Sequence, residues 1–383
     1  MGLLLAAGPL EAQTQPDTLR RPVEVDFLLH YYEQEGVHSA VTGGLGTEQL
    51  DDRGGTLRVY APLDSTQALA ATAAFNHYTS ASTDRIDSYL SSASRKDGHA
   101  ALSLVYEQGY RQRRSWYLGG SGAIESDYLS AALAGGYIWV SGDANRRFSL
   151  DGELFFDTWI VIFPEELRAP GLASVPTDKR RTLDVQATLW QIVNPRLQLA
   201  LSADLSVQHG LLSTPFHRVY MQGEPVARIE RLPGWRIKYP LSLRLHYFVW
   251  DWLVLRGYYR WYHDSFGISA HTLSLETPVK LGTFFSVYPL YRLHVQQASR
   301  YFAPYAMHDP DARFYTSDYD MSGFVSHKYG LGLSLAPLYG LARFRLGPRH
   351  AGLWRNIDLR GTRYLRSDGL SAWNVSLQTG LRL

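Results

Sequence analysis

The clearest pattern in this chain is an alternation of apolar and polar positions that recurs along most of its length. Apolar residues, or threonine, occupy every second position from Trp373 to Leu383, with Asn, Ser, Gln, Gly and Arg between them. The runs 197–207 and 237–247 show the same period over 11 residues each. A period of two is typical of β-strands with one apolar face. Strands of soluble proteins usually have about 5–6 residues, whereas a tilted membrane-spanning strand needs about 9–11. Length therefore favours a membrane barrel over the alternative, a soluble lectin-like β protein.

Segments with this pattern predict sixteen strands. They lie at residues 24–33, 56–62, 67–78, 99–110, 114–123, 127–141, 146–162, 179–192, 196–209, 235–249, 252–265, 269–278, 283–301, 323–336, 353–366 and 371–383. An even number of strands brings both termini to the periplasmic side, as in bacterial outer-membrane barrels. Fourteen strands are the alternative, if the first segment is a plug or if 337–366 does not form the expected wall strand.

The connections between these strands differ in length in a regular way. Short ones are expected at 142–145, 194–196 and 251, and long ones at 79–98, 163–178, 210–234 and 302–322. The order of the strands places all four long connections on one side, the extracellular one, which is the arrangement of outer-membrane barrels. The sequence contains no run of 18 apolar residues, so we expect no transmembrane helix. The predicted fold is therefore all-β, a transmembrane antiparallel up-and-down β-barrel, since only a closed barrel can then satisfy the backbone in lipid.

The domain organisation is expected to be simple. Residues 1–12 have a short apolar core and a plausible cleavage site after Ala12, which predicts a truncated signal peptide. The basic start of such a signal is missing, and a disordered tail is the alternative. Residues 13–383 would form a single barrel domain. Within it, residues 36–52 are rich in glycine and could fold into the lumen as a plug or line its mouth; an ordinary long loop is the alternative.

Composition narrows the function. Aromatic residues make up 13% of the chain and charged residues only 19%, as expected when an outward apolar surface and aromatic girdles face a membrane. The net charge of +2 does not indicate a nucleic-acid partner. The chain has no cysteine, so we expect no disulfides, no thiol catalysis and no lipid anchor on an N-terminal cysteine.

Five segments resemble an uncharacterised family of predicted bacterial outer-membrane β-barrels, defined only as a domain of unknown function. They are residues 31–48, 78–84, 211–220, 315–320 and 366–371. The resemblance extends from about Val25 to Leu383 and implies an outer-membrane location, but it brings no substrate and no catalytic residues. Gene neighbourhoods of the family imply a small lipoprotein, a flavin-transferring enzyme and a thioredoxin-like protein as partners. The last strand also resembles the C-terminal signal for the barrel-assembly machinery, although it ends in Leu383 where an aromatic residue is usual.

A basic strip is predicted on the face opposite the lipid. Charges that face lipid near the bilayer midplane cost about 2–4 kcal/mol each, so these residues should face the lumen. The strip consists of Arg244, His246, Arg256, Arg260, Arg292 and His294, with Glu276 and Asp264 as nearby acids. Basic side chains lining a pore select anions. In the alternative interpretation the arginines pair with lumenal acids such as Asp151, Glu153 and Asp157 and only brace the wall.

A second candidate site is an acidic loop that contains Asp309, Asp311, Asp318 and Asp320. Clustered carboxylates can hold a hard cation such as Ca²⁺, but the spacing is not that of an EF-hand. The alternative is a polar surface loop with Asx turns.

No enzymatic function is expected. The sequence contains neither a GxSxG elbow nor an HExxH motif. Loop residues that could form a hydrolase site are His38, His217, His271, His308, Asp84 and Ser213, a set that chance alone supplies in a chain with 13 histidines. The pattern as a whole predicts an outer-membrane pore for small polar, anionic solutes, with no cofactor. The alternative is a plugged receptor or an envelope-assembly accessory that acts with the lipoprotein and the redox and flavin-transfer partners.

Overall fold

The computed structural model describes residues 22–79, 96–109, 112–168, 176–345 and 351–383. The expected signal peptide, at residues 1–12, lies outside these ranges. The structure is an all-β, closed antiparallel barrel of sixteen wall strands, which confirms the predicted fold class and strand number. β1 (Glu24–Gly36) pairs with both β2 (Glu48–Pro62) and β21 (Ser371–Arg382), and this pairing closes the ring. The first strand is therefore part of the wall and not a plug.

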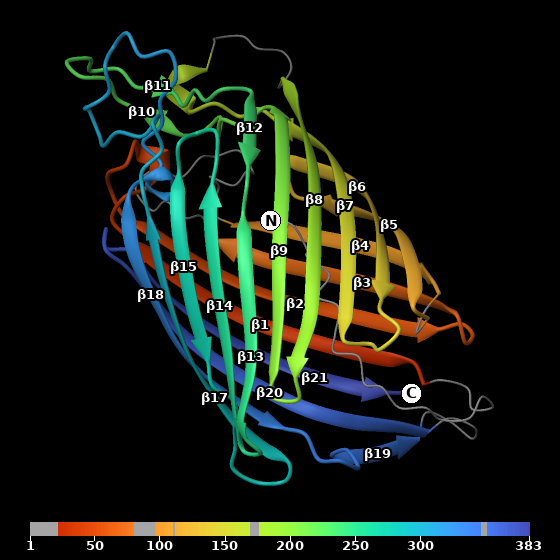
Figure 1. Cartoon of the computed structure of the whole chain (residues 1–383). Coiled ribbons are helices and arrows are strands. Elements are labelled where there is room, and N and C mark those ends of the chain that lie inside the picture. Colours follow the sequence, from red (N-terminus) through yellow and green to blue (C-terminus); the bar gives the residue numbers. More distant parts are fainter. Residues whose placement is uncertain (1–21, 80–95, 110–111, 169–175, 346–350) are drawn as a thin grey trace.

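The strands follow one another around the wall in chain order (Figure 1). Two wall positions are each shared by two short strands in sequence, β12 with β13 and β15 with β16. The remaining elements are β3 (Gln67–Thr79), β4 (Lys96–Gln108), β5 (Arg114–Ile124), β6 (Tyr128–Val140), β7 (Arg146–Ile160), β8 (Thr177–Asn194), β9 (Leu197–Gly210), β10 (Arg218–Val219), β11 (Arg228–Ile229), β12 (Trp235–Lys238), β13 (Leu241–Trp250), β14 (Leu253–His263), β15 (Ser269–Glu276), β16 (Val279–Lys280), β17 (Phe285–Gln296), β18 (Phe324–Leu335), β19 (Ala342–Arg345) and β20 (Ala351–Arg366), with three short 3₁₀ helices, η1 (Ala40–Thr42), η2 (Glu165–Leu167) and η3 (Tyr319–Met321).

The largest departure from the predicted bounds is at β2, which begins at Glu48 and not at residue 56. Its first half contains charged residues and two glycines, and these hide the alternation in the sequence. In the structure Gly54 pairs with His30 of β1, and the Asp52 carboxylate accepts a hydrogen bond from the Asn76 amide of β3 (3.1 Å). Of the segment expected at 36–52 as a plug or mouth segment, Gly36 and residues 48–52 thus belong to the wall, and residues 37–47 connect the two strands at the mouth.

The two ends of the barrel differ, as the sequence predicted. Turns such as 195–196 and 251–252 lie at one end, which we call the short-turn end, together with the backbone hydrogen bonds between Val23 and Leu383 (3.0 and 2.8 Å). The connection 37–47, the described residues 161–168, and the connections 211–234 and 297–323 lie at the other, the long-loop end, at the top of Figure 1. The loop predicted at 79–98 falls largely outside the described residues.

Each wall strand has an apolar outer face and a polar inner face. Leu133, Phe75 and Leu118 are 63%, 63% and 61% exposed, values that mark the outer surface of the wall. Contacts that bridge over intervening strands identify the inner face, since only the concave side of a curved sheet brings such residues together. Glu276 of β15 and Arg360 of β20 form one such pair (2.9 Å), with β17 and β18 between them. Among the described residues, no helix combines the length and apolar character needed to cross a membrane.

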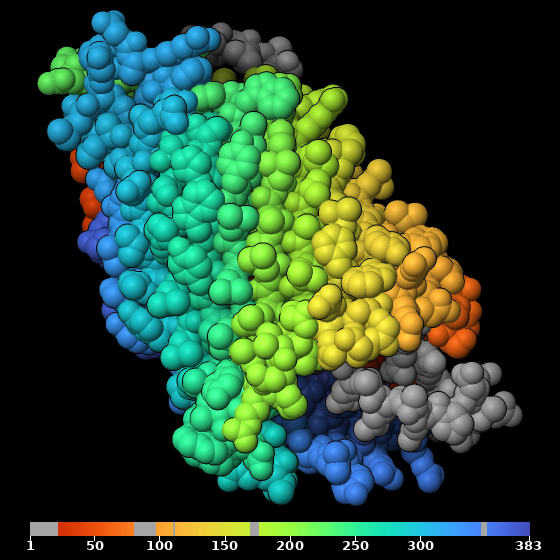
Figure 2. Space-filling view, in the orientation of Figure 1, coloured from red at the N-terminus to blue at the C-terminus, as the bar shows by residue number. Residues whose placement is uncertain are grey.

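Apolar clusters of buried residues lie at the long-loop end, where the loops pack on one another. One is formed by Leu232, Phe266, Ile268 and Met321, and a second by Val219, Met221 and Tyr315. We call the described parts of the loops 37–47, 161–168, 211–234 and 297–323 the mouth cap. It projects from the upper end of the wall in Figure 2, where the loops 211–234 and 297–323 (green and blue) stand above closely packed wall strands.

Candidate functional site

The predicted basic strip lies on the inner face of four neighbouring wall strands. The registers bring its members next to one another: His246 faces Arg256, Arg260 faces Thr272, and Thr272 in turn faces His294. Lys328 of β18 lies directly opposite Arg292, and Arg360 of β20 continues the strip. These two cations were missed in the sequence because glycines and a bulge interrupt the alternation of their strands.

The strip has few acidic partners. The Glu276 carboxylate forms ion pairs with the guanidinium groups of Arg256 and Arg360, with N–O distances of 2.9 Å in each. Within the part of the chain that the structure describes, Arg244, Arg260 and Arg292 form no ion pair. The Arg292 Nε donates to the Ser274 hydroxyl at 2.9 Å, and the Arg244 guanidinium lies over aromatic rings of the same inner face.

The acids that the sequence suggested as partners lie elsewhere. Asp157 pairs with Arg180 (2.9 Å), and Asp151 accepts from the Tyr117 hydroxyl (2.8 Å). Asp264, expected beside the strip, is fully buried at the long-loop end and pairs with Arg236. Asp151 and Asp157 therefore do not form ion pairs with the arginines of the strip.

The mouth cap joins loops from opposite sides of the ring. Arg218, in the loop after β9, donates two hydrogen bonds to Glu166 (2.6 and 2.9 Å) and one to the Val41 carbonyl (2.6 Å). Val41 belongs to the loop after β1, and β1 stands eight positions from β9 in the ring of sixteen. His38, from the same loop, stacks on Tyr319 of the loop 297–323 with 3.8 Å between ring centroids. The loops thus meet across the end of the barrel and narrow its mouth.

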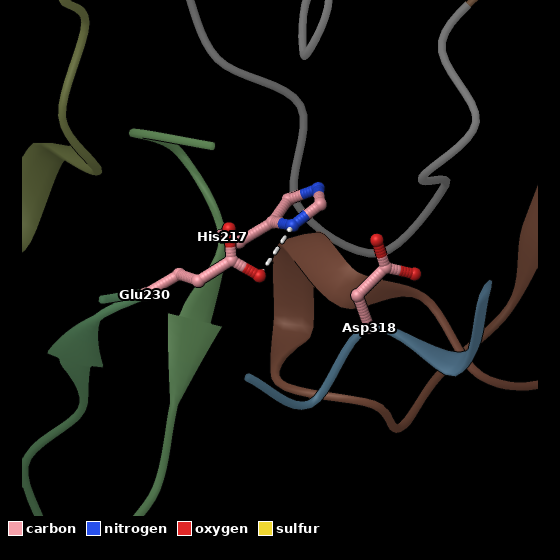
Figure 3. Close-up of side chains that lie close together, drawn as sticks. All are labelled: His217, Glu230 and Asp318. Atoms are coloured by element: carbon pink, nitrogen blue, oxygen red, sulfur yellow. Dashed lines mark ion pairs between the residues drawn. The ribbon is translucent and has the colours of Figure 1, made fainter. Parts of the chain in front are cut away.

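Within the cap, His217, Glu230 and Asp318 approach one another from two separate loops (Figure 3). Their nearest ligand atoms all lie within 4.8 Å of one another. The β10–β11 hairpin places His217 next to Glu230, whose backbone N–H donates to the His217 carbonyl (3.0 Å). The His217 Nδ1 lies 3.5 Å from the Glu230 Oε1.

Hydrogen bonds fix the two carboxylates of this cluster. The fully buried Thr316 hydroxyl donates to the Glu230 Oε1 and accepts from the Asp318 backbone N–H. The Thr214 backbone N–H donates to the other oxygen of Glu230 (2.6 Å). Asp318 in turn caps η3 by accepting from the Asp320 backbone N–H (2.9 Å). These bonds fix the Glu230 carboxylate and the backbone at Asp318, and ligand atoms of the two side chains lie within 4.8 Å of each other.

Electrostatics in the cluster follow from burial and from the excess of acids. Burial raises the pKa of Asp318 to about 6, and the Asp320 carboxylate adds to the rise. Burial by itself would lower the pKa of His217, but the Glu230 carboxylate, with Asp318 and Asp320 behind it, outweighs burial and raises that pKa. The cluster therefore favours positive charge at its centre.

The acidic loop predicted from the sequence is not one cluster. Asp309 accepts from the Asp311 backbone N–H (2.9 Å) in an Asx turn, and both residues are exposed. Asp320 pairs with Arg366. Only Asp318 joins a group of three ligating side chains within the described residues, with His217 and Glu230. The sequence offered no signal for this group, because His217 and Glu230 belong to a different loop.

The other loop residues considered for hydrolase chemistry are separated. His308 is buried, which lowers its pKa, and its Nε2 donates to the Thr316 carbonyl (3.0 Å). The Ser213 hydroxyl accepts from the Leu232 backbone N–H (2.8 Å), and His271 lies on the wall beside Tyr259. Asp84 lies outside the described residues.

A closed ring of sixteen long strands, with an apolar outer face and a polar inner face, defines a barrel of the transmembrane type. The sequence belongs to the family described as protein of unknown function DUF3570, whose model matches residues 4–340. The resemblance inferred from the sequence segments is thereby confirmed, apart from the segment 366–371, which lies beyond the match. No curated protein matches the chain.

Solved structures share the barrel at low identity. The siderophore receptor PirA from Pseudomonas aeruginosa is 11% identical, with a TM-score of 0.42, and the match covers 96% of this chain and 81% of that one. A bacterial polysaccharide outer membrane secretin is 10% identical, with a TM-score of 0.48, covering 95% and 99%. The ferric enterobactin receptor PfeA from Pseudomonas aeruginosa is 8% identical, with a TM-score of 0.47, covering 90% of this chain and 53% of that one. Likenesses with TM-scores below 0.5 do not bear on function.

Proposed function

We propose that this protein is an outer-membrane pore that passes small polar, anionic solutes. Lipid would cover the exposed apolar residues of the outer face, such as Leu133 and Phe75, after insertion by the barrel-assembly machinery. Barrels of 16–18 strands leave an aqueous channel, unlike barrels of about eight strands, which side chains fill. The exposed inward arginines of the strip, such as Arg292, support a lumen with room for water and solutes.

The observation that carries the proposal is the pair Arg292 and Lys328. The two cations face each other directly across β17 and β18, and among the described residues neither forms an ion pair. Like charges directly opposite on neighbouring strands are destabilising, so stability alone does not account for the pair. An anion that passes along the inner wall would meet both charges, together with Arg244 and Arg260 on the neighbouring strands.

The mouth cap would then act as the filter at the entrance. Arg218 holds loops of opposite walls together, which leaves less room than the ring of strands alone would. A narrowed mouth above a basic wall would restrict passage to small solutes and would favour negative charge.

Conductance in planar bilayers tests this function. We expect the reversal potential in a KCl gradient to report a preference for chloride. The double substitution Arg292→Gln with Lys328→Gln should reduce that preference. The matched control is Lys280→Gln with Arg343→Gln, which removes two exposed cations outside both the strip and the mouth cap and should leave the reversal potential unchanged. A cation preference of the unaltered protein would overturn the proposal.

One observation favours the second candidate, a receptor or an envelope-assembly accessory. The mouth cap contributes to two buried apolar clusters and makes contacts across the ring, so it presents a firm surface on which a partner such as the small lipoprotein could dock. Failure of the folded protein to conduct, together with co-purification of the lipoprotein, would favour this candidate over the pore.

A further inference from the structure

We propose that His217, Glu230 and Asp318 form a binding site for a divalent transition-metal ion, with Zn²⁺ as the fitting member of that class. The site lies in the mouth cap, outside the wall and the basic strip. It does not depend on the protein's being a pore, because a metal could clip the cap loops of a receptor equally well.

The donor set matches the chemistry of such an ion. One imidazole nitrogen and two carboxylate oxygens are ligands that Zn²⁺ accepts, whereas Ca²⁺ and Mg²⁺ take oxygen ligands. Zinc bonds to nitrogen and oxygen are about 2.0–2.2 Å long, so two ligand atoms of one tetrahedral ion stand roughly 3.4 Å apart. The 3.5 Å between the His217 Nδ1 and the Glu230 Oε1 has this length. Asp318 lies within 4.8 Å and would complete three protein ligands.

The Nδ1 atom of His217 is the second observation. It is buried and makes no hydrogen bond among the described residues, and its ion-pair contact is the Glu230 Oε1 at 3.5 Å. A buried polar atom without a partner is costly, and this one points at the Glu230 carboxylate. A metal ion between the two would give the nitrogen a ligand bond and would offset the charge of the buried Glu230 carboxylate and of the half-buried Asp318.

The surroundings of the carboxylates also suit a metal site. Metal-binding carboxylates are usually oriented by hydrogen bonds from an outer shell of residues. Here a single buried hydroxyl, that of Thr316, contacts Glu230 and the backbone of Asp318, and the Thr214 N–H holds the second Glu230 oxygen. Because His217 and Glu230 come from the loop 211–234 and Asp318 from the loop 297–323, a bound ion would lock the two loops together.

The other group of three acids in the described residues does not support a site in the same way. Asp97, Glu125 and Asp127 contain no histidine. The Ser126 hydroxyl donates to Asp97 (2.6 Å) and the Tyr78 hydroxyl donates to Glu125 (3.1 Å), so these carboxylates already have protein partners.

Calorimetric titration with Zn²⁺ tests the site. The full chain, folded in detergent, without a polyhistidine tag and freed of metal by a chelator, should take up one Zn²⁺ per chain. Co²⁺ in its place should give the visible absorption of a four-coordinate ion. His217→Gln and Asp318→Asn should each weaken Zn²⁺ binding roughly tenfold or more, on the scale seen when metal sites lose positioning groups.

The matched control is Asp309→Asn with Asp311→Asn, which removes two exposed carboxylates from the same loop. It should leave Zn²⁺ binding unchanged. Heat-modifiable mobility on a gel shows that each variant still forms the barrel, and His217→Gln serves if Asp318→Asn does not fold. The absence of Zn²⁺ uptake by the unaltered protein, equal weakening by the control, or unchanged binding by His217→Gln would each overturn the site. The cluster would then be a buried ion pair of His217 with Glu230.

Discussion

Glu276 and Arg360 form a 2.9 Å ion pair although two wall strands separate β15 from β20. The same carboxylate receives Arg256 from β14. Glu276, the last residue of β15, is thus the acid that partly neutralises the basic strip. Both arginines are about half exposed, so the pairs should contribute little to the stability of the wall.

Glu276→Gln should therefore change selectivity more than stability. Removing the one carboxylate frees two arginines, and the chloride preference in planar bilayers should rise. The change in unfolding free energy should stay within about 1 kcal/mol, the range of exposed ion pairs. Glu107→Gln is the control, since Glu107 also faces the lumen but lies on β4, next to Tyr60. An equal rise with Glu107→Gln would mean that total lumenal charge, and not the strip, sets selectivity.

Leu133→Arg tests whether lipid covers the outer face. Leu133 lies in the middle of β6 and is 63% exposed, and an arginine near the bilayer midplane costs about 2–4 kcal/mol. Urea unfolding from lipid vesicles should show this loss. Leu338→Arg is the control, because Leu338 is 88% exposed in the connection after β18, at the short-turn end. Equal, small effects of both substitutions would contradict a membrane around the wall.

Arg218→Met should loosen the mouth cap. Arg218 is 6% exposed and joins Glu166 to the Val41 carbonyl. Loss of these buried hydrogen bonds should weaken the cap by about 1–3 kcal/mol and raise the population of locally open loops roughly fivefold or more. Faster protease cleavage within 211–234 and a larger single-channel conductance would show that the cap loops open more often.

The control for the cap is Arg231→Met. Arg231 belongs to the same loop, but its side chain is exposed and makes no hydrogen bond or ion pair among the described residues. Its loss should leave both measurements unchanged. Cleavage and conductance that do not respond to Arg218→Met would show that the cap is held by its apolar clusters alone.

Thr316→Val should weaken Zn²⁺ binding at the proposed site without removing a ligand. The hydroxyl donates to the Glu230 carboxylate and accepts from the Asp318 backbone N–H, and loss of such outer-shell partners typically costs 10–100-fold in metal affinity. Ser317→Ala is the control, because its hydroxyl donates to the Ala303 carbonyl (3.0 Å) and not to the carboxylates. A similar loss with Ser317→Ala would assign the effect to general loosening of the loop.

The sequence by itself determined the wall. The alternation of apolar and polar residues can be seen within the sequence of each strand, without knowledge of its neighbours. The sixteen strands, and the end of the barrel that has the long connections, could therefore be predicted. The prediction failed at 48–55, where Asp52 and Gly54 look like loop residues but face a polar lumen beside His30. The position of the basic strip was also predictable, because its charged residues occupy the polar positions of the alternating pattern and therefore face the lumen.

Only the tertiary structure decided how the loops meet. Arg218 and Val41 are 177 residues apart in the chain, and Thr316 and Glu230 are 86 apart. Loops have no repeating pattern that reports their neighbours, and their contacts depend on which strands the closed ring places side by side or face to face. The mouth cap and the cluster of His217, Glu230 and Asp318 therefore follow from closure of the barrel and the packing of its loops, and no single stretch of the sequence contains them.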